Sequence, residues 1–186
     1  MSISSIEDNT YYEIMRHCIE ISYNCPITPG AFSVGSSLFL PAFAATFAAL
    51  EPHFQHFGAK GLILSDGWSR QKPGNTHAEA NALTNLRQKY EELSNSIRQL
   101  PPIEEVLKDV ECFTTMEPCS IRTSGGPSCA RELVKSKIKT VYLGVKEPPD
   151  FVQCEGVRIL QEGGVNVVKV AGLEEECINA ARRGRE

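Results

Sequence analysis

Short apolar runs alternate along this chain with longer stretches of helical periodicity, and this alternation restricts the possible folds more than any other feature. A strand or helix with an apolar face must bury that face against another layer of secondary structure. The clearest helix follows residue 77, where apolar residues recur three and four positions apart until two prolines end it. Its apolar positions are Leu83, Leu86, Tyr90, Leu93, Ile97 and Leu100. The alternation predicts an α/β sandwich with helices on both faces of one sheet.

The other expected elements keep this alternation. We expect strands over residues 31–40, 61–65, 110–115, 138–145 and 165–170. We expect further helices over residues 8–23, 128–136, 152–161 and 173–182.

Residues 41–58 separate two expected strands by far more than a hairpin turn requires. We interpret this Phe- and Ala-rich stretch as a helical insertion. It contains four Phe residues, more than a surface loop normally exposes. The insertion could pack against its own domain, cover the pocket or form an interface between copies of the chain, and its Phe content favours the interface.

Length and charge limit the possible functions. The 186 residues fit one domain, and a formal net charge of −4 disfavours the nucleic-acid-binding proteins, which usually carry a basic face. The longest apolar stretch, residues 38–50, is shorter than the ~20 residues that span a bilayer. No secretory signal is visible, and the seven cysteines are an odd number. We therefore expect reduced thiols in the cytoplasm or nucleus, with no membrane and no nucleic-acid partner.

Three potential metal ligands stand beside expected elements. His77 lies at the start of the long helix, Cys119 follows a strand, and Cys129 begins another helix. Taken singly, each is more typical of a core histidine or a buried thiol. Together, one imidazole and two thiols suit tetrahedral Zn²⁺, and helix N-termini favour the thiolate form. Three protein ligands leave a fourth position for water, which is the arrangement of a catalytic zinc site.

Glu79 lies two residues after His77, near this ligand but pointing differently around the helix. Two thiolates offset the charge of the metal, so a nearby base is useful to take the proton from the bound water. The pattern predicts hydrolysis with Glu79 as the acid and base. A carboxylate stabilised only by the helix dipole is the simpler alternative.

The order His-Ala-Glu, then Pro-Cys, then a second Cys resembles the cytidine-deaminase superfamily, whose signature pairs these ligands with an acid/base Glu. Within it, the chain resembles the fungal deaminases of riboflavin biosynthesis, the diaminohydroxyphosphoribityl-aminopyrimidine deaminases. Nine residues separate Cys119 from Cys129, where deaminases of nucleosides or tRNA usually have two. The resembling stretches are residues 31–35, 67–70, 73–79, 115–120, 144–148 and 172–177.

The resemblance implies a three-layer α/β/α cytidine-deaminase-like sandwich with a mixed central sheet of about five strands. It implies that His77, Cys119 and Cys129 bind Zn²⁺ and that Glu79 shuttles protons. The implied substrate is 2,5-diamino-6-ribitylamino-4(3H)-pyrimidinone 5′-phosphate, which loses the amine at C2 as ammonia. We also expect a homodimer.

A phosphorylated substrate needs hydrogen-bond donors in an otherwise acidic protein. The loop between the cysteines and the segment before the long helix both offer such groups. The candidate substrate contacts are Arg70, Asn75, Ser120 and Arg122.

Two other functions stay open on the sequence alone. One is a deaminase of a free nucleobase or nucleoside, against which the wide cysteine loop and its Arg122 argue. The other is a catalytically inactive zinc-stabilised binding protein, which would have no use for Glu79.

The chain departs from the bacterial riboflavin deaminases at one position of the site. Those proteins carry Asn-Pro before the Val-Gly pair of the first strand, whereas this chain has Phe32-Ser33. The contact that their Asn makes with the base is therefore not carried over.

Overall fold

The computed structural model describes residues 4–122, 125–146 and 155–183. Six strands form one sheet in the order β2-β3-β1-β4-β5-β6. The first four strands in this order pair antiparallel, and β4, β5 and β6 pair parallel, so the sheet is mixed. The strands are β1 (Gly35–Pro41), β2 (Gln55–Phe57), β3 (Gly61–Trp68), β4 (Glu111–Met116), β5 (Thr140–Val145) and β6 (Asn166–Lys169).

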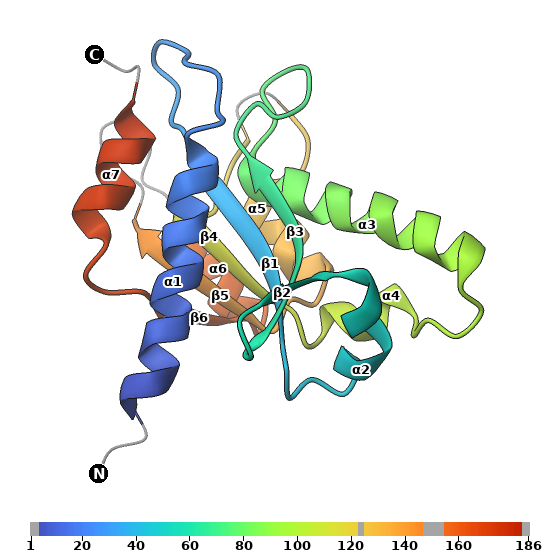
Figure 1. Ribbon diagram of the computed structural model, residues 1–186. Coiled ribbons are helices and arrows are strands. Elements are labelled where there is room, and N and C mark those ends of the chain that lie inside the picture. Colours follow the sequence, from blue (N-terminus) through green and yellow to red (C-terminus); the bar gives the residue numbers. More distant parts are fainter. Residues whose placement is uncertain (1–3, 123–124, 147–154, 184–186) are drawn as a thin grey trace.

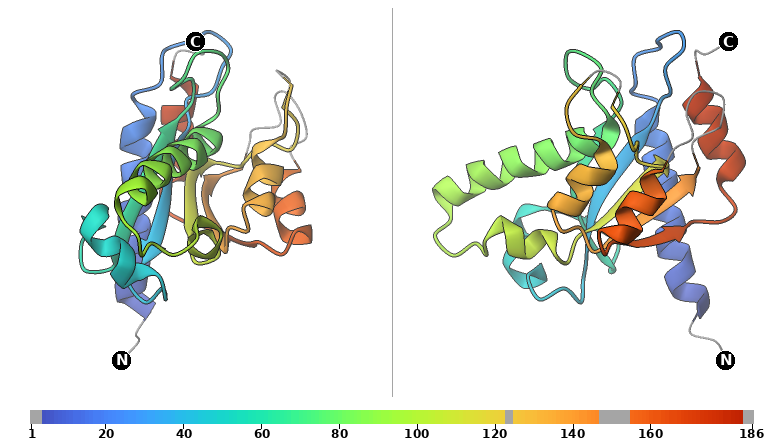
Figure 2. Two further views of the ribbon diagram at one scale, coloured as in Figure 1. Left: turned by 90° about the vertical axis from the view of Figure 1, so that its right-hand side faces the viewer. Right: turned by 180° about the vertical axis from the view of Figure 1, so that it is seen from behind.

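Helices cover both faces of this sheet, as Figures 1 and 2 show. One face carries α1 (Ser4–Ser22) and α7 (Glu174–Arg182), and the other carries α3 (Ala78–Ser96), α5 (Cys129–Lys135) and α6 (Gly156–Glu162). Two shorter helices complete the fold. Helix α2 (Phe47–Leu50) lies between β1 and β2 in the chain, and α4 (Ile103–Leu107) lies between α3 and β4. The expected three-layer α/β/α sandwich with a mixed sheet is therefore confirmed.

Each face of the sheet has its own apolar core, and the central strand β4 contributes to both. Cys112 packs into the core under α3 and α5, whereas its neighbour Phe113 packs into the core under α1 and α7. Alternate residues of a strand point to opposite faces, so β4 is buried at all six positions. This burial explains why the strand appears in the sequence as a run without polar alternation.

The expected helical insertion is only partly helical. Residues 47–50 form α2 and residues 51–53 form a 3₁₀ turn, but residues 55–57 form β2, which pairs antiparallel with β3. This strand raises the count from the expected five to six. It has only three residues, too few to show an alternating pattern, and the pairing with β3 rather than local preference makes it a strand.

Several element bounds differ from those expected, and β1 begins at Gly35 rather than at residue 31. Helix α1 begins at Ser4 rather than at residue 8, and the long helix ends at Ser96, so that Leu100 lies beyond it. Strand β3 continues to Trp68, and α4 was not anticipated. The start of the helix expected over residues 152–161 lies outside the described residues. In the part of the chain that the structure describes, no helix is both long and apolar enough to cross a membrane.

Gly67 determines how closely the long helix approaches the sheet. A Cβ atom at this position of β3 would lie 2.2 Å from the carbonyl oxygen of Ala78, in the first turn of α3. Only glycine allows the backbones to come this close. This contact fixes the start of α3, and therefore His77 and Glu79, against the end of β3.

Candidate functional site

His77 precedes the first residue of α3 and occupies its N-cap position with an extended backbone. Its side chain makes no capping hydrogen bond to the helix, so the imidazole is free to point toward the two cysteines. Asn81 holds the preceding loop, because its Nδ2 donates to the carbonyl of Trp68 at 2.8 Å and to Thr76 Oγ1 at 2.9 Å. The loop that carries His77 is thus anchored to the helix that follows it.

The two cysteines reach the same point from the loop after β4 and from the start of α5. The Sγ atoms of Cys119 and Cys129 each lie 3.5 Å from Nδ1 of His77. The three ligand atoms all lie within 4.8 Å of one another. Zinc–nitrogen bonds near 2.0 Å and zinc–sulfur bonds near 2.3 Å in a tetrahedron place N and S about 3.6 Å apart. The donor set and its spacing therefore fit Zn²⁺.

The charges of the two sulfur atoms depend on each other. Hydrogen bonds from Cys129 and His77 lower the pKa of the Cys119 thiol to about 4, although burial opposes this. The backbone N–H of Cys129, at the start of α5, also donates to Cys119 Sγ at 3.3 Å. The pKa of Cys129 is raised, because a second thiolate beside Cys119 would be buried next to a negative charge. A divalent cation at this point offsets that repulsion and allows both sulfur atoms to be thiolates.

Glu79 lies in the first turn of α3 and is only 4% exposed. Burial, and then the negative charge of Cys119, raise the pKa of this carboxyl group above its ordinary value, whereas His77 lowers it. The hydroxyl of Thr114, on β4, lies 3.3 Å from Glu79 Oε1 and can donate to it. A buried carboxylate with a raised pKa beside a metal site is suited to accept and return a proton.

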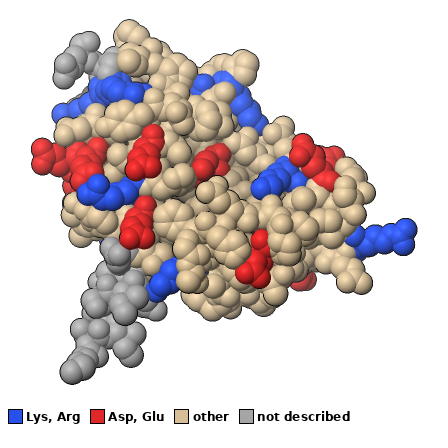
Figure 3. Space-filling model, in the orientation of Figure 1, with Lys and Arg blue, Asp and Glu red and all other residues tan. Residues whose placement is uncertain are grey.

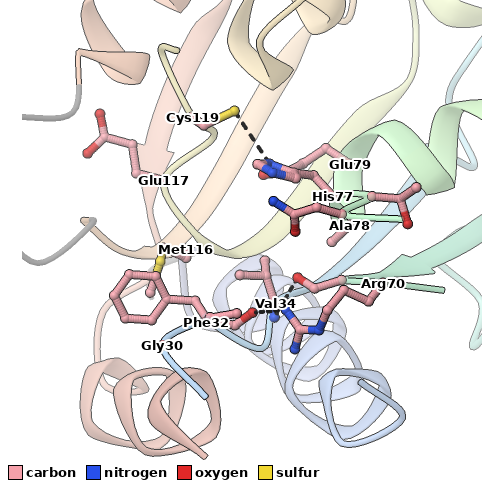
Figure 4. A pocket seen from close by; sticks show the side chains of 14 residues that line it. Gly30, Phe32, Val34, Arg70, His77, Ala78, Glu79, Met116, Glu117 and Cys119 are labelled. Carbon is pink, nitrogen blue, oxygen red and sulfur yellow. Dashed lines mark hydrogen bonds between the residues drawn. The ribbon is translucent and has the colours of Figure 1, made fainter. Parts of the chain in front are cut away.

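A cavity of about 210 Å³ opens beside these residues, and Figure 4 shows the side chains that line it. His77, Glu79 and Cys119 form its polar wall. Phe32 and Met116 lie together on another side, as Figure 4 shows, and make that side apolar. The cavity therefore offers a flat apolar surface and a proton-transfer group, as an aromatic heterocycle with an exocyclic amine requires.

The four expected substrate contacts lie in different places. Arg70 and Asn75 line the cavity, whereas Ser120 and Arg122 lie next to it on the cysteine loop. Nη2 of Arg122 donates to the carbonyl of Asn75 at 3.2 Å, which ties this loop to the loop before α3. All three guanidinium nitrogens of Arg70 donate to residues of the segment before β1. These four assignments as substrate contacts stay predictions.

Comparison with known families identifies the metal site. Residues 57–145, which include all three ligands and Glu79, match the cytidine and deoxycytidylate deaminase zinc-binding region. This part of the chain is a zinc-binding region of the cytidine-deaminase superfamily. The match confirms zinc as the metal that the spacing of His77, Cys119 and Cys129 predicts.

Several relatives within this superfamily carry names from riboflavin biosynthesis. The diaminohydroxyphosphoribosylamino-pyrimidine deaminase of Schizosaccharomyces pombe is 32% identical over 184 residues, which are 99% of this chain and 38% of that protein. The riboflavin biosynthesis protein RibD of Chlamydia trachomatis is 32% identical over 62% of this chain and 26% of its own length. This chain therefore spans well under half the length of either relative.

Solved structures show the same fold. The Rib2 deaminase of Aspergillus oryzae aligns with a TM-score of 0.72 and 29% identity, covering 95% of this chain and 92% of the other. A further structure of the Aspergillus oryzae protein, in complex with DARIPP, aligns with a TM-score of 0.70 and 26% identity over the same shares of both chains.

Two residues of this zinc site were not singled out from the sequence for a role of their own. Thr114 faces Glu79 from β4, and the buried Glu117 accepts a hydrogen bond from the backbone N–H of Val157 at 2.9 Å through Oε1. Glu117 thereby ties the first turn of α6 to the segment that carries Cys119. Its place directly before Pro118-Cys119 is the only sequence signal for this role, and no local signal marks Thr114.

Proposed function

We propose that this chain is a zinc-dependent aminohydrolase of riboflavin biosynthesis. It would hydrolyse 2,5-diamino-6-ribitylamino-4(3H)-pyrimidinone 5′-phosphate at C2, giving 5-amino-6-ribitylamino-2,4-pyrimidinedione 5′-phosphate and ammonia. The observation that carries the proposal is the buried Glu79 beside a three-ligand zinc site at the wall of a cavity. The names of the fungal and bacterial relatives, and the DARIPP complex of the Aspergillus oryzae protein, support the choice of substrate.

The chemistry follows from the groups at the site. His77, Cys119 and Cys129 would hold the zinc, which when bound would lower the pKa of a water molecule and so provide the nucleophile. Carbon C2 of the substrate is amidine-like and open to attack by that nucleophile. Glu79 accepts the proton that the water loses and gives it to a ring nitrogen. It then carries the second proton of the water to the leaving amine, so that water is consumed and ammonia is released.

The position of Glu79 suits this proton transfer. Its raised pKa means that the carboxyl group holds a proton more readily than an exposed glutamate does. Thr114 can fix one carboxyl oxygen, which leaves the other to exchange protons at the cavity wall. In a protein that used zinc only for stability, burial of this carboxylate would reduce the free energy of unfolding without contributing to function.

Arg122 supports a phosphorylated substrate. The hydrogen bond with Cys119 raises the pKa of His77, and the positive charge of the Arg122 guanidinium, which lies beside the site, opposes this rise. None of the described carboxylates forms an ion pair with it. A guanidinium with free donors beside a cavity can bind a phosphate bidentately. Figure 3 shows acidic and basic side chains interspersed on the face of Figure 1, in keeping with a small-molecule substrate rather than a polynucleotide.

Ammonia release tests the proposal. The purified chain is incubated with the ribityl substrate, with its ribosyl counterpart and with cytidine, each with and without a zinc chelator. We expect chelator-sensitive ammonia from the ribityl or ribosyl pyrimidine phosphate and little from cytidine. Release from cytidine alone would instead support a nucleoside deaminase. No chelator-sensitive ammonia from any of the three would refute catalysis.

We further propose a homodimer that uses the segment from residue 41 to 58. Phe43 is 75% exposed and lines a cavity of about 400 Å³ together with Phe39, Pro41 and Lys60. In contrast, Phe47 and Phe54 pack against the core of their own chain, so only part of the insertion would be available for the interface. Sedimentation of the wild type and of Phe43→Ser tests this, with Ile27→Ser, at another exposed position, as the control. A wild-type monomer at micromolar concentration would contradict the proposal.

A cytoplasmic location also stays a proposal. The six cysteines that the structure describes are all free thiols, and four of them are buried away from the zinc site. Free, buried thiols are typical of reducing compartments. Fluorescence microscopy of the tagged chain tests the location.

A further inference from the structure

The segment between α1 and β1 forms one wall of the cavity. Gly30, Ala31, Phe32 and Val34 all line it. Residues 23–34 form no helix or strand, and they contain a turn in which the backbone N–H of Ala31 donates to the carbonyl of Thr28 at 3.2 Å. A wall of this kind is poorly determined by its own hydrogen bonds and needs to be held from outside.

Arg70 holds this wall from the loop before α3. Its Nη1 donates to the carbonyl of Phe32 at 2.9 Å, and its Nη2 and Nε donate to the carbonyl of Pro26 at 2.9 Å and 3.2 Å. Nη2 also lies 3.3 Å from Ser33 Oγ. One guanidinium therefore bridges both ends of the segment, as Figure 4 shows for its contact with Phe32.

The backbone conformation of Arg70 supports a role for its side chain at this position. Its φ angle is +61°, in the left-handed region that glycine adopts without strain and other residues rarely occupy. A non-glycine residue persists there only where the surroundings determine it. Its neighbour Ser69 binds the same wall, donating from its N–H to the carbonyl of Val34 at 3.0 Å and accepting from the Val34 N–H at 3.1 Å.

Arg183 holds the same segment from the opposite side, at the end of α7. Its Nη2 donates to the carbonyls of Tyr23 at 2.7 Å and of Cys25 at 3.0 Å. Its guanidinium carbon also lies 4.8 Å from the centre of the Tyr23 ring. Close by, the N–H of Ser33 donates to the carbonyl of Ala181 at 2.9 Å. Arg183 does not line the cavity, so it would act only through the segment it holds.

We propose that Arg70 and Arg183 are positioning residues that together hold residues 23–34 as the substrate-facing wall. Arg70 would then act through Phe32 rather than as a direct substrate contact. The C-terminal turn of α7 would be coupled to the cavity through Arg183. The kinetic part of this inference rests on the proposed deaminase function, whereas the structural part does not.

Hydrogen exchange tests the structural part without any substrate. In Arg70→Gly and Arg183→Ala, exchange of the amides of residues 26–34, other than Pro26 and Pro29, should be about tenfold faster or more, because charge-assisted hydrogen bonds are lost. Exchange within α3 and the zinc content should stay as in the wild type. Arg70→Gly is informative because glycine adopts a positive φ without strain, so the backbone at this position is not destabilised. A loss of protection from exchange in this variant is then due to the missing guanidinium. Arg16→Ala, which removes an exposed arginine of α1, is the matched control. Unchanged exchange of residues 26–34 in both variants would overturn the proposal.

Steady-state kinetics tests the functional part. In both variants we expect KM to rise about tenfold for the phosphorylated substrate and equally for its dephosphorylated form, with a smaller change in kcat. Arg70→Lys, which keeps the charge but loses the planar fork, should resemble Arg70→Gly. A KM rise limited to the phosphorylated substrate in the Arg70 variants, with Arg183→Ala unaffected, would show direct phosphate binding and refute positioning. If the wild type deaminates no pyrimidine, the proposed function fails, while the exchange experiment still decides whether the wall is held.

Discussion

Glu111 begins β4, at the end of the strand opposite the zinc ligands, and we expect its carboxyl group to reduce stability at neutral pH. The residue is only 4% exposed, and Oε2 has no hydrogen-bond partner within the described part of the chain. Burial raises its pKa from 4.5 to about 7, although the positive charge of Lys139 opposes the rise. The ionised form is therefore poorly solvated in the folded chain.

The sign and size of the effect follow from proton linkage. The folded chain binds this proton more tightly than the unfolded chain, so the free energy of unfolding falls as the pH rises from 4.5 through about 7. Each pH unit between these two values corresponds to about 1.4 kcal/mol, which gives an upper limit of about 3.5 kcal/mol. Between pH 5 and pH 8, this group alone should lower the free energy of unfolding by roughly 2–3 kcal/mol. Glu111→Gln removes the titration and keeps the size of the side chain.

Urea unfolding of the zinc-loaded protein at pH 5, 6, 7 and 8 measures this effect. The wild type and Glu111→Gln are compared at each pH, so that groups which titrate alike in both proteins cancel. The variant should gain roughly 2–3 kcal/mol relative to the wild type between pH 5 and pH 8. Glu91→Gln, at an exposed position of α3, is the control and should show no such gain. A difference between wild type and Glu111→Gln that stays constant with pH would refute the reasoning.

Three further predictions concern the site. Glu79→Gln should keep its zinc, measured by elemental analysis, and lose about 10²–10⁴-fold in kcat, whereas turnover like the wild type would exclude the acid/base role. Cys129→Ser should hold zinc at least tenfold more weakly in a chelator competition, since it loses a thiolate ligand, and equal retention would contradict ligation. Arg122→Ala should raise KM about tenfold for the phosphorylated substrate only, and an unchanged KM would show that Arg122 does not bind the phosphate.

The zinc site could be predicted from the sequence because its ligand residues lie next to helix and strand boundaries that the sequence reveals. His77 and Glu79 share one helix turn, and each cysteine adjoins a boundary that the apolar pattern reveals. Such boundaries are set by short-range preferences, namely helix periodicity and strand composition. The three ligand types then suffice to predict the metal without knowing how the sheet is ordered.

The cavity wall could not be predicted in the same way. Arg70 contacts Pro26 and Phe32, which are 44 and 38 residues away in the chain, and Arg183 contacts Tyr23 across 160 residues. No local pattern encodes such pairs. The sequence therefore identified Arg70 as a residue near the site, but not the carbonyl groups to which it donates. Strand β2 escaped prediction for a related reason, since its pairing with β3 determines its conformation.

Two buried carboxylates, Glu79 and Glu111, have similar burial but different surroundings. Glu79 and Glu111 are equally buried at 4% exposure, and burial raises the pKa of both. They differ in their surroundings, because Glu79 faces a cavity, a hydroxyl group and the metal ligands, whereas Oε2 of Glu111 has no partner among the described residues. A raised pKa alone therefore does not identify a catalytic acid. Proton transfer also requires access to the substrate, and in this fold only the end of β4 that leads to Cys119 adjoins the cavity beside the zinc ligands.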